Sequence, residues 1–171
     1  EILSRLGSSG RLYAMDRDPE AIAVARELED ADPRFQVFYG PFSDIARFMG
    51  EAGVAGRIDG ILFDLGVSSP QFDDPSRGFS FSHDGPLDMR MDNGTGQTAA
   101  EWLAHADERE IALVLRRYGE EPRARRIAAA IAAFRGGAAL TPSGPLSERV
   151  CSGVRRPARA HHPARRTFQW L

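Results

Sequence analysis

The sequence has no lysine, a single cysteine and no long apolar run. All 22 basic residues are arginine, a bias that either the base composition of the gene or a polyanionic partner would produce. The lone Cys151 excludes an internal disulfide and fits a reducing compartment, so we expect a cytoplasmic protein. No stretch of about 18 apolar residues occurs, and the first residues lack a secretory signal, so no membrane span or secretion is expected.

The charges that are present are unevenly distributed. The net charge is −2, but residues 1–92 hold 17 acidic residues against 9 arginines. Residues 149–171 hold 6 arginines and no acidic residue. A basic tail on an acidic body suggests a polyanionic partner such as a nucleic acid.

The first third of the chain alternates between strand and helix patterns. A short apolar run at 11–15 ends on Asp16, and the stretch DPEAIAVARELED predicts a helix because Asp18 is a suitable cap and Pro19 suits a first helical position. A second strand is predicted at 34–40. A short helix capped by Ser43 follows it, and IDGILFD at 58–64 predicts a third strand. This order predicts an α/β fold with a parallel, doubly wound sheet.

Three residues fall at or just after the carboxyl ends of these predicted strands, namely Asp16, Phe42 and Asp64. Ligands of such sheets bind along that rim. Asp16 is suited to accept hydrogen bonds from the hydroxyls of a ribose, although the motif DRDP would also serve simply to start a helix. No glycine-rich phosphate loop precedes Asp16, since LGSSGR is typical of a turn. Either that loop lies upstream of residue 1, or the ribose interpretation is wrong.

The remainder of the sequence has a different pattern. Residues 66–96 lack periodicity, are rich in Gly, Pro, Ser and Asp, and predict a long functional loop held by apolar anchors. Helices are predicted after capping boxes at Thr98 and Asp107, and again from Pro122 to about residue 136. The change to a purely helical pattern marks a boundary near residues 93–97.

Several catalytic classes are disfavoured by the residues around Asp64. The acids that follow it lack metal-loop spacing, so no metal is expected. Ser68 and Ser69 lack the Gly-x-Ser-x-Gly motif of a nucleophile elbow, which argues against a serine hydrolase. The four histidines are expected at the surface.

A set of longer motifs is distinctive, comprising YAMDRDPEAIAVA, GPFSD, DGILFDLGVSSPQFDDPSRGFSFSHDGPLDMRMD, TAAEWL, YGEE and HPARRTFQ. Together they strongly resemble the bacterial family of S-adenosylmethionine-dependent methyltransferases that modify the N4 exocyclic amine of a cytidine in small-subunit ribosomal RNA. The resemblance implies an incomplete Rossmann-like class I methyltransferase sheet with an inserted helical domain. It implies a partial core with its active-site loop at 1–92, the inserted domain at 93–165 and the start of a return to the core at 166–171.

The resemblance also assigns roles to individual residues. Asp16 would bind the ribose of S-adenosylmethionine, Phe42 would lie against its adenine, and Asp64 and Gln71 would contact its amino-acid end near the methyl donor. The catalytic residue is unassigned, with Asp64 as a candidate acceptor for the amine's hydrogens. The partner would be ribosomal RNA or the small ribosomal subunit. Its phosphates would be held by three arginines, for which a solvated helix face is the alternative: Arg123, Arg125 and Arg126.

The sequence departs from the family pattern in three places. The family's glycine-rich loop would precede residue 1, and its sheet would continue beyond Gln169, so we expect an internal fragment that is weakly active or inactive alone. Residues 136–161 do not match, and their Arg, Pro, Gly and Ala bias resembles a GC-rich stretch translated out of frame. Two alternatives stay open: an NAD-dependent Rossmann oxidoreductase, which also uses a ribose-binding acid, and an inactive RNA-binding remnant.

Overall fold

The computed structural model describes residues 1–80 and 85–135, which divide into two compact units. Unit 1 comprises residues 1–65 and 91–94, and unit 2 comprises 66–90 and the chain from 95 onward. The stretch 136–161, the predicted return to the core at 166–171 and the basic tail lie outside the described residues. Within the described part, no helix has both the length and the apolar character needed to cross a membrane.

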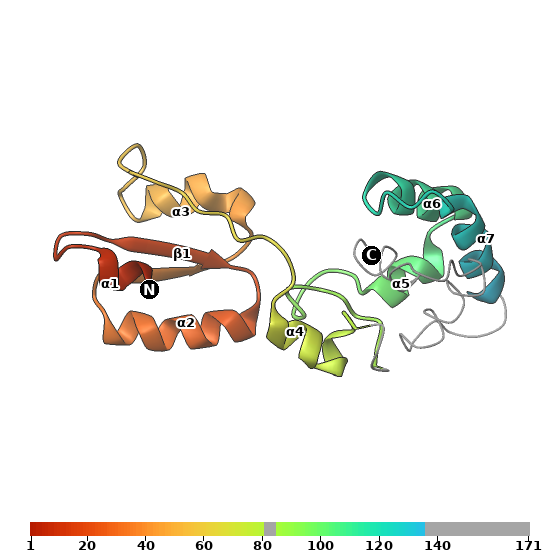
Figure 1. Ribbon diagram of the computed structural model, residues 1–171, viewed down its shortest axis with the longest axis horizontal. Coiled ribbons are helices and arrows are strands. Elements are labelled where there is room, and N and C mark those ends of the chain that lie inside the picture. The colour runs from red at the N-terminus through yellow and green to blue at the C-terminus, as the bar shows by residue number, and fades with distance from the viewer. Residues whose placement is uncertain (81–84, 136–171) are drawn as a thin grey trace, which may run out of the picture. The chain divides into compact units, whose positions relative to one another are not determined.

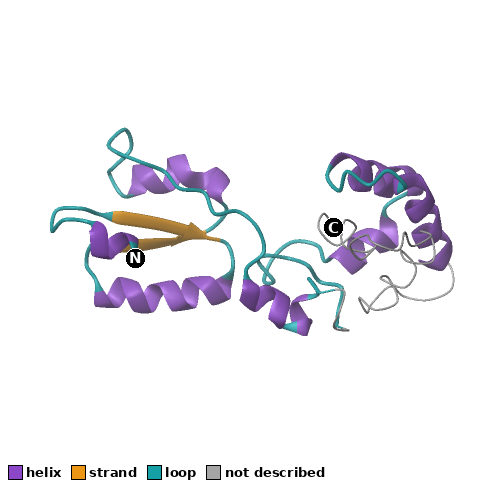
Figure 2. Cartoon of the chain, viewed as in Figure 1, coloured by secondary structure: helices purple, strands orange, loops and turns teal. Residues whose placement is uncertain are grey.

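Unit 1 is built on two parallel strands joined by a helix. Strand β1 (Leu12–Asp16) pairs with β2 (Phe35–Tyr39), and Asp16 lies opposite Tyr39 in the register. The connecting helix α2 (Pro19–Ala31) begins as the sequence predicts, because the Asp18 side chain accepts a hydrogen bond from the Glu20 amide at 3.0 Å. A short helix, α1 (Ile2–Arg5), precedes β1. The parallel βαβ unit confirms the α/β class, shown by the orange strands and purple helices in Figure 2.

Helices cover both faces of this small sheet, with α2 on one side and α3 (Ile45–Glu51) on the other (Figure 1). Phe48 of α3 stacks on Phe38 of β2 with ring centroids 5.0 Å apart. Gly40, which follows β2, has φ +152°, and a Cβ there would meet the Phe48 ring at 2.8 Å. A residue without a side chain is therefore needed where the chain leaves β2.

The start of α3 differs from the prediction. A 3₁₀ turn, η1 (Phe42–Asp44), precedes the helix, and Asp44 rather than Ser43 occupies the N-cap position. The Asp44 side chain makes no cap hydrogen bond, because it accepts instead from the Arg47 guanidinium at 2.7 Å. The predicted Ser43 cap was therefore wrong.

The predicted third strand is also absent. Among the described residues the sheet has two strands, and residues 58–63 pair with neither. The side chains of Ile61, Leu62 and Phe63 are 60%, 78% and 56% exposed. A strand requires a hydrogen-bonded neighbour, and this segment forms no ladder with β1 or β2. The described sheet is therefore a two-stranded parallel one.

Unit 2 begins with a segment for which the sequence predicted only loop. Helix α4 (Ser69–Asp73) and the 3₁₀ turn η2 (Pro75–Arg77) lie within it. Ser68 and Gln71 form a capping box at the start of α4, and Pro70 occupies its second position. These are local signals for a helix start, so the prediction of a loop without helices over 66–96 was wrong at this point.

The core of unit 2 lies among three helices that the sequence predicted: α5 (Ala99–His105), α6 (Glu108–Arg117) and α7 (Ala124–Arg135). Thr98 and Glu101 form the predicted capping box, and the Asp107 side chain accepts from the Glu110 amide at 2.7 Å. The most deeply buried side chains are Leu87, Leu103, Ile111, Leu115, Ile127 and Ile131. Leu87 belongs to the preceding loop, whose end is therefore part of this core.

Candidate functional site

The carboxyl end of β1 presents an exposed carboxylate. The Asp16 carbonyl accepts a hydrogen bond from the Gly40 amide at 2.8 Å, which fixes the strand end, and its Oδ1 accepts from the Asp18 amide at 2.9 Å. Asp18, not Asp16, caps α2. The Oδ2 atom of Asp16 receives no hydrogen bond from a described residue, so it is available to accept one from a ligand.

Phe42 and Phe63 form a second element of this rim. Phe42 is 54% exposed and meets the 56% exposed Phe63 edge to face, with ring centroids 6.1 Å apart. Phe63 directly precedes Asp64, which is also exposed. The structure thus brings Phe42 close to the 63–64 segment, and both rings offer exposed apolar surface to a flat ligand.

Gln71 has a different setting. It is 4% exposed, and its Oε1 accepts a hydrogen bond from the Ser68 amide at 2.9 Å. In this structure its side chain helps to start α4. Its predicted contact with a cofactor stays a prediction.

Sequence reasoning missed a contact beside Asp16. The Tyr39 hydroxyl donates to Oδ2 of Asp92 at 2.6 Å, and Asp92 is only 7% exposed. The hydrogen bond to this carboxylate raises the pKa of Tyr39. The hydrogen bond between Tyr39 and Asp92 joins residues 91–94 to the end of β2. Tyr39 lies in the strand predicted at 34–40, but no local signal could reveal a partner 53 positions away.

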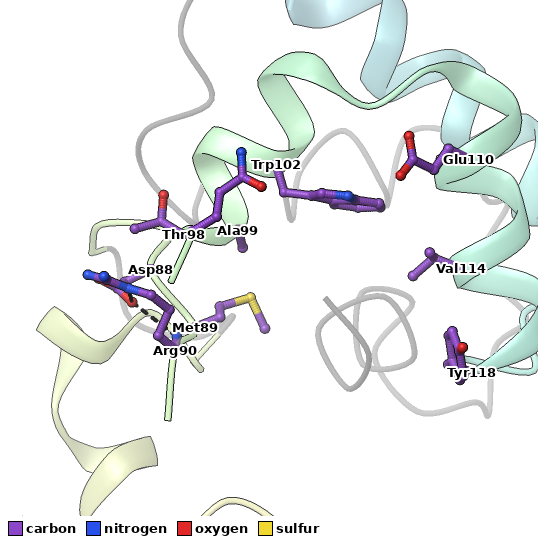
Figure 3. Close-up of a pocket in the computed structure, with 10 residues that line it drawn as sticks. Asp88, Met89, Arg90, Thr98, Ala99, Trp102, Glu110, Val114 and Tyr118 are labelled. Carbon is purple, nitrogen blue, oxygen red and sulfur yellow. Dashed lines mark hydrogen bonds and ion pairs between the residues drawn. The ribbon is translucent and has the colours of Figure 1, made fainter. Parts of the chain in front are cut away.

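Unit 2 contains a cavity of about 320 Å³ that the sequence did not predict (Figure 3). One wall is polar and includes Asp88 and Arg90, which form an ion pair at 2.7 Å that lowers the pKa of Asp88. The opposite wall carries the Trp102, Val114 and Tyr118 side chains. The Glu110 carboxylate lies on the same side as Trp102 and Val114, so charged groups line both sides of the cavity (Figure 3). None of the site residues predicted from the sequence lines this cavity.

The three predicted RNA-binding arginines lie around the start of α7. Arg123, Arg125 and Arg126 are all exposed. The Arg123 amide donates to Oε1 of Glu121 at 2.9 Å, which fixes the turn before the helix. No group of three or more His, Cys, Asp or Glu side chains that would hold a metal ion is found in the described part of the chain.

Comparison with known proteins gives consistent matches along the chain. The model of the MraW methylase family matches residues 1–171. Two curated relatives, from Shewanella baltica strains OS155 / ATCC BAA-1091 and OS185, are both named ribosomal RNA small subunit methyltransferase H. Each is 51% identical over 169 residues, which cover 99% of this chain and 54% of the relative. The chain therefore spans about half the length of the curated relatives it matches.

Proposed function

The chain belongs to the MraW methylase family, and on that premise we propose that it methylates the N4 amine of a cytidine in small-subunit ribosomal RNA, using S-adenosylmethionine. The relatives' name states action on ribosomal RNA of the small subunit. The observation that carries the proposal is the exposed Asp16 carboxylate at the carboxyl end of β1, where α/β sheets bind nucleotides. Family membership does not favour the NAD-dependent alternative.

The residues on the rim fit the proposed cofactor. Asp16 has a carboxylate oxygen available for ribose hydroxyls, and Phe42 offers an exposed ring for adenine. When bound, S-adenosylmethionine supplies a methyl group already activated on a sulfonium. The protein therefore needs no covalent nucleophile, and its task is to hold the two reactants in line.

Asp64 is proposed to orient the target amine. The lone pair of a cytosine amine is delocalised into the ring, which makes the nitrogen a weak nucleophile. A carboxylate that accepts the amine's hydrogens favours the charge that develops on this nitrogen during transfer. Asp64 is exposed and directly follows Phe63, so a base lying against that ring would bring its amine toward this carboxylate.

We further propose the domain organisation and location that this function implies. Residues 1–92 form a partial Rossmann-like methyltransferase core with its active-site loop, 93–165 an inserted helical domain, and 166–171 the start of a return to the core. The RNA is held by positive charge around Arg123, Arg125 and Arg126. Because bacterial ribosomes are assembled in the cytoplasm, the reaction is placed there.

The test measures cofactor binding and methyl transfer separately. Calorimetry with S-adenosylmethionine should show binding that Asp16→Asn weakens. Radiolabelled S-adenosylmethionine and unmethylated small ribosomal subunits should then give labelled N4-methylcytidine, identified by nucleoside mass spectrometry. Asp64→Asn should lower the transfer rate by about 100-fold or more, as loss of a transition-state hydrogen-bonding group does.

Asp59→Asn is the matched control. Asp59 is an exposed acid in the same 58–64 segment as Asp64, and it has no assigned role. Near-normal transfer by Asp64→Asn would refute the role of that residue. Binding of RNA without any methyl transfer would instead favour the RNA-binding remnant. Protection from unfolding by NAD, but not by S-adenosylmethionine, would favour the oxidoreductase.

A further inference from the structure

Four arginines cluster at one end of the α6–α7 hairpin. Arg116 and Arg117 occupy the last turn of α6, and Arg125 and Arg126 the first turn of α7. All four are exposed. We call them the hairpin-end arginine surface.

The turn between the helices keeps these arginines at the same end. The Glu121 amide donates to the Leu115 carbonyl at 3.1 Å, so the turn folds back against the end of α6. Leu115, Ala124 and Ile127 are buried in one cluster, which packs the adjoining parts of the two helices together. Figure 1 shows α6 and α7 side by side.

These arginines are set apart by their shared position at one end of the hairpin, and their lack of ion pairs with described residues leaves their charge available to a ligand. None of the four forms an ion pair with a described residue. Glu121 is 7% exposed and its carboxylate accepts from the Arg123 amide, and it forms no ion pair with any of the four. Some arginines elsewhere in the described chain pair with nearby carboxylates, namely Arg5 with Glu1, Arg34 with Asp32, Arg47 with Asp44 and Glu51, and Arg90 with Asp88. Others also lack an ion pair with a described residue but lie apart from one another in the sequence, namely Arg11, Arg17, Arg26, Arg57 and Arg109.

Arg125 and Arg126 also violate a local rule of helix stability. The first turn of α7 has no acidic residue. The helix dipole disfavours positive charge at this end. The Glu121 carboxylate, bonded to the Arg123 amide just before the helix, offsets part of this charge. An anionic ligand would offset more of it, and positions that break a local rule are characteristic of functional surfaces.

The neighbouring aromatic residue fits the same ligand. The Arg117 guanidinium lies over the Tyr118 ring at 5.6 Å from its centroid, and Tyr118 is 48% exposed. A guanidinium held on a ring presents its N–H groups in a fixed plane suited to phosphate oxygens. An exposed ring beside phosphate-binding groups also provides a stacking surface for a base.

We propose that the hairpin-end arginine surface binds the phosphodiester backbone of RNA, with Arg116, Arg117, Arg125 and Arg126 as the phosphate ligands. The contacts are to phosphates, so they anchor the RNA without selecting its sequence. This inference rests on the proposed function, because the RNA it binds is the proposed substrate. The sequence suggested Arg123, Arg125 and Arg126 as RNA-binding residues. The proposal adds Arg116 and Arg117 as phosphate ligands, and it gives Arg123 a structural role in the turn before α7.

The test measures RNA affinity rather than methylation. A fluorescein-labelled single-stranded oligoribonucleotide of mixed sequence is titrated by anisotropy at several salt concentrations. The variant carries Arg→Gln at all four surface positions. Its Kd should rise at least about tenfold, and the slope of log affinity against log salt should fall by about 3, the value for four released contacts on a single strand.

The matched control removes four exposed arginines elsewhere, namely Arg11, Arg26, Arg57 and Arg109. It changes the net charge equally, so it should leave the salt slope nearly unchanged if the surface is specific. Arg→Lys at the four surface positions should restore most of the affinity, because Lys keeps the charge. Far-ultraviolet circular dichroism of each variant reports whether the helices are intact.

Three results would overturn the proposal. The first is equal weakening of RNA binding by both quadruple variants, and the second is an unchanged salt slope in the surface variant with intact helices. The third is displacement of RNA by an acidic peptide at the same charge concentration as by unlabelled RNA, which would indicate a protein partner. Intact RNA binding without methyl transfer would contradict the proposed function but not this surface.

Discussion

At the scale of single residues, Asp32 and Arg34 form a well-organised ion pair just before β2. Two nitrogens of the Arg34 guanidinium donate to the two Asp32 oxygens at 2.6 and 3.0 Å, and the Arg34 amide also donates to Oδ1 at 2.9 Å. A further bond from Arg34 to the Leu6 carbonyl at 3.1 Å joins the pair to the end of α1. These hydrogen bonds favour the ionised carboxyl and hold the pKa of Asp32 at about 2, below its ordinary value of 3.8.

This pair predicts a specific dependence of stability on pH. Because the pKa of Asp32 is lower in the folded state, its carboxylate stabilises the fold above pH 3.8, and that contribution is lost as the pH falls toward about 2. Asp32→Asn should therefore lower the free energy of unfolding near neutral pH, with the difference from the parent shrinking over this window. Urea denaturation across a pH series measures it, with Asp30→Asn as a charge control. A difference that stays constant down to pH 2 would contradict the assignment.

Residue roles could be predicted from the sequence where the partner lies within a few positions. The caps formed by Asp18 and Thr98 are of this kind, since each bonds an amide two or three residues ahead. The bond between Tyr39 and Asp92 could not be predicted, because it depends on how the chain returns after a long loop. The cofactor contact of Gln71 came from the family resemblance alone and stays a prediction, whereas the cap it forms with Ser68 depends on residues three positions apart.

At the scale of elements, backbone hydrogen bonds in unit 2 join the end of η2 to residues 87–89 and these residues to the start of α5. The Met89 amide donates to the Arg77 carbonyl at 3.0 Å, so the end of η2 lies beside the segment before α5. The carbonyls of Leu87 and Asp88 then accept hydrogen bonds from the first amides of α5, at 2.9 and 2.8 Å. Gly78, with φ +74°, directly follows η2 and lies against residues 86–88. Because Gly78 has no side chain, the two segments can approach this closely.

Gly78→Ala should therefore destabilise unit 2 strongly. An added Cβ would collide with the Pro86 carbonyl oxygen and lie 2.7 Å from the Asp88 amide nitrogen. Positive φ alone costs a residue with a side chain about 1–2 kcal/mol, and backbone displacement adds about 1–3 kcal/mol. Denaturant unfolding measures the total loss.

Gly96→Ala is the control for this prediction. Gly96 has a nearly identical φ of +77°, but a Cβ there would meet no atom within 4 Å. This variant should show only the cost of the positive φ, so the difference between the two variants isolates the collision. If the two variants lose the same free energy of unfolding, Gly78 and residues 86–88 are not in close contact.

Elements could be predicted where a local pattern carries the whole signal. The helical periods over α2, α5, α6 and α7 are such cases, since the same side chains that repeat in sequence form the buried face. The segment 58–63 has an equally clear apolar pattern but forms no strand. Apolar composition shows that a segment can be buried, whereas a strand also needs a neighbour to pair with. That requirement is not local and could not be read from the segment itself.

At the scale of the whole molecule, the described chain has two separate hydrophobic cores. In unit 1 the buried apolar side chains are Ile22, Phe35, Phe48 and Met49. In unit 2 all of them except Phe79 form one cluster around Leu103, Ile111 and Ile127. Each unit thus has its own set of buried contacts, as expected of parts that gain their stability separately.

Two matched core substitutions should therefore act on different parts of the chain. Phe48, 4% exposed, stacks on Phe38 in unit 1, and Ile127, 0% exposed, lies in the core of unit 2. Each change to Ala removes a buried side chain and leaves a cavity, at a cost of about 3–5 kcal/mol for Phe and 2–5 kcal/mol for Ile.

Hydrogen exchange followed by mass spectrometry shows in which elements the backbone amides lose protection. Phe48→Ala should accelerate exchange in β1, β2 and α2 while α6 and α7 keep their protection, and Ile127→Ala should do the reverse. If either variant accelerates exchange equally in both sets of elements, the two units unfold together as one cooperative unit. In that case the two units do not gain their stability separately, although each has its own buried side chains.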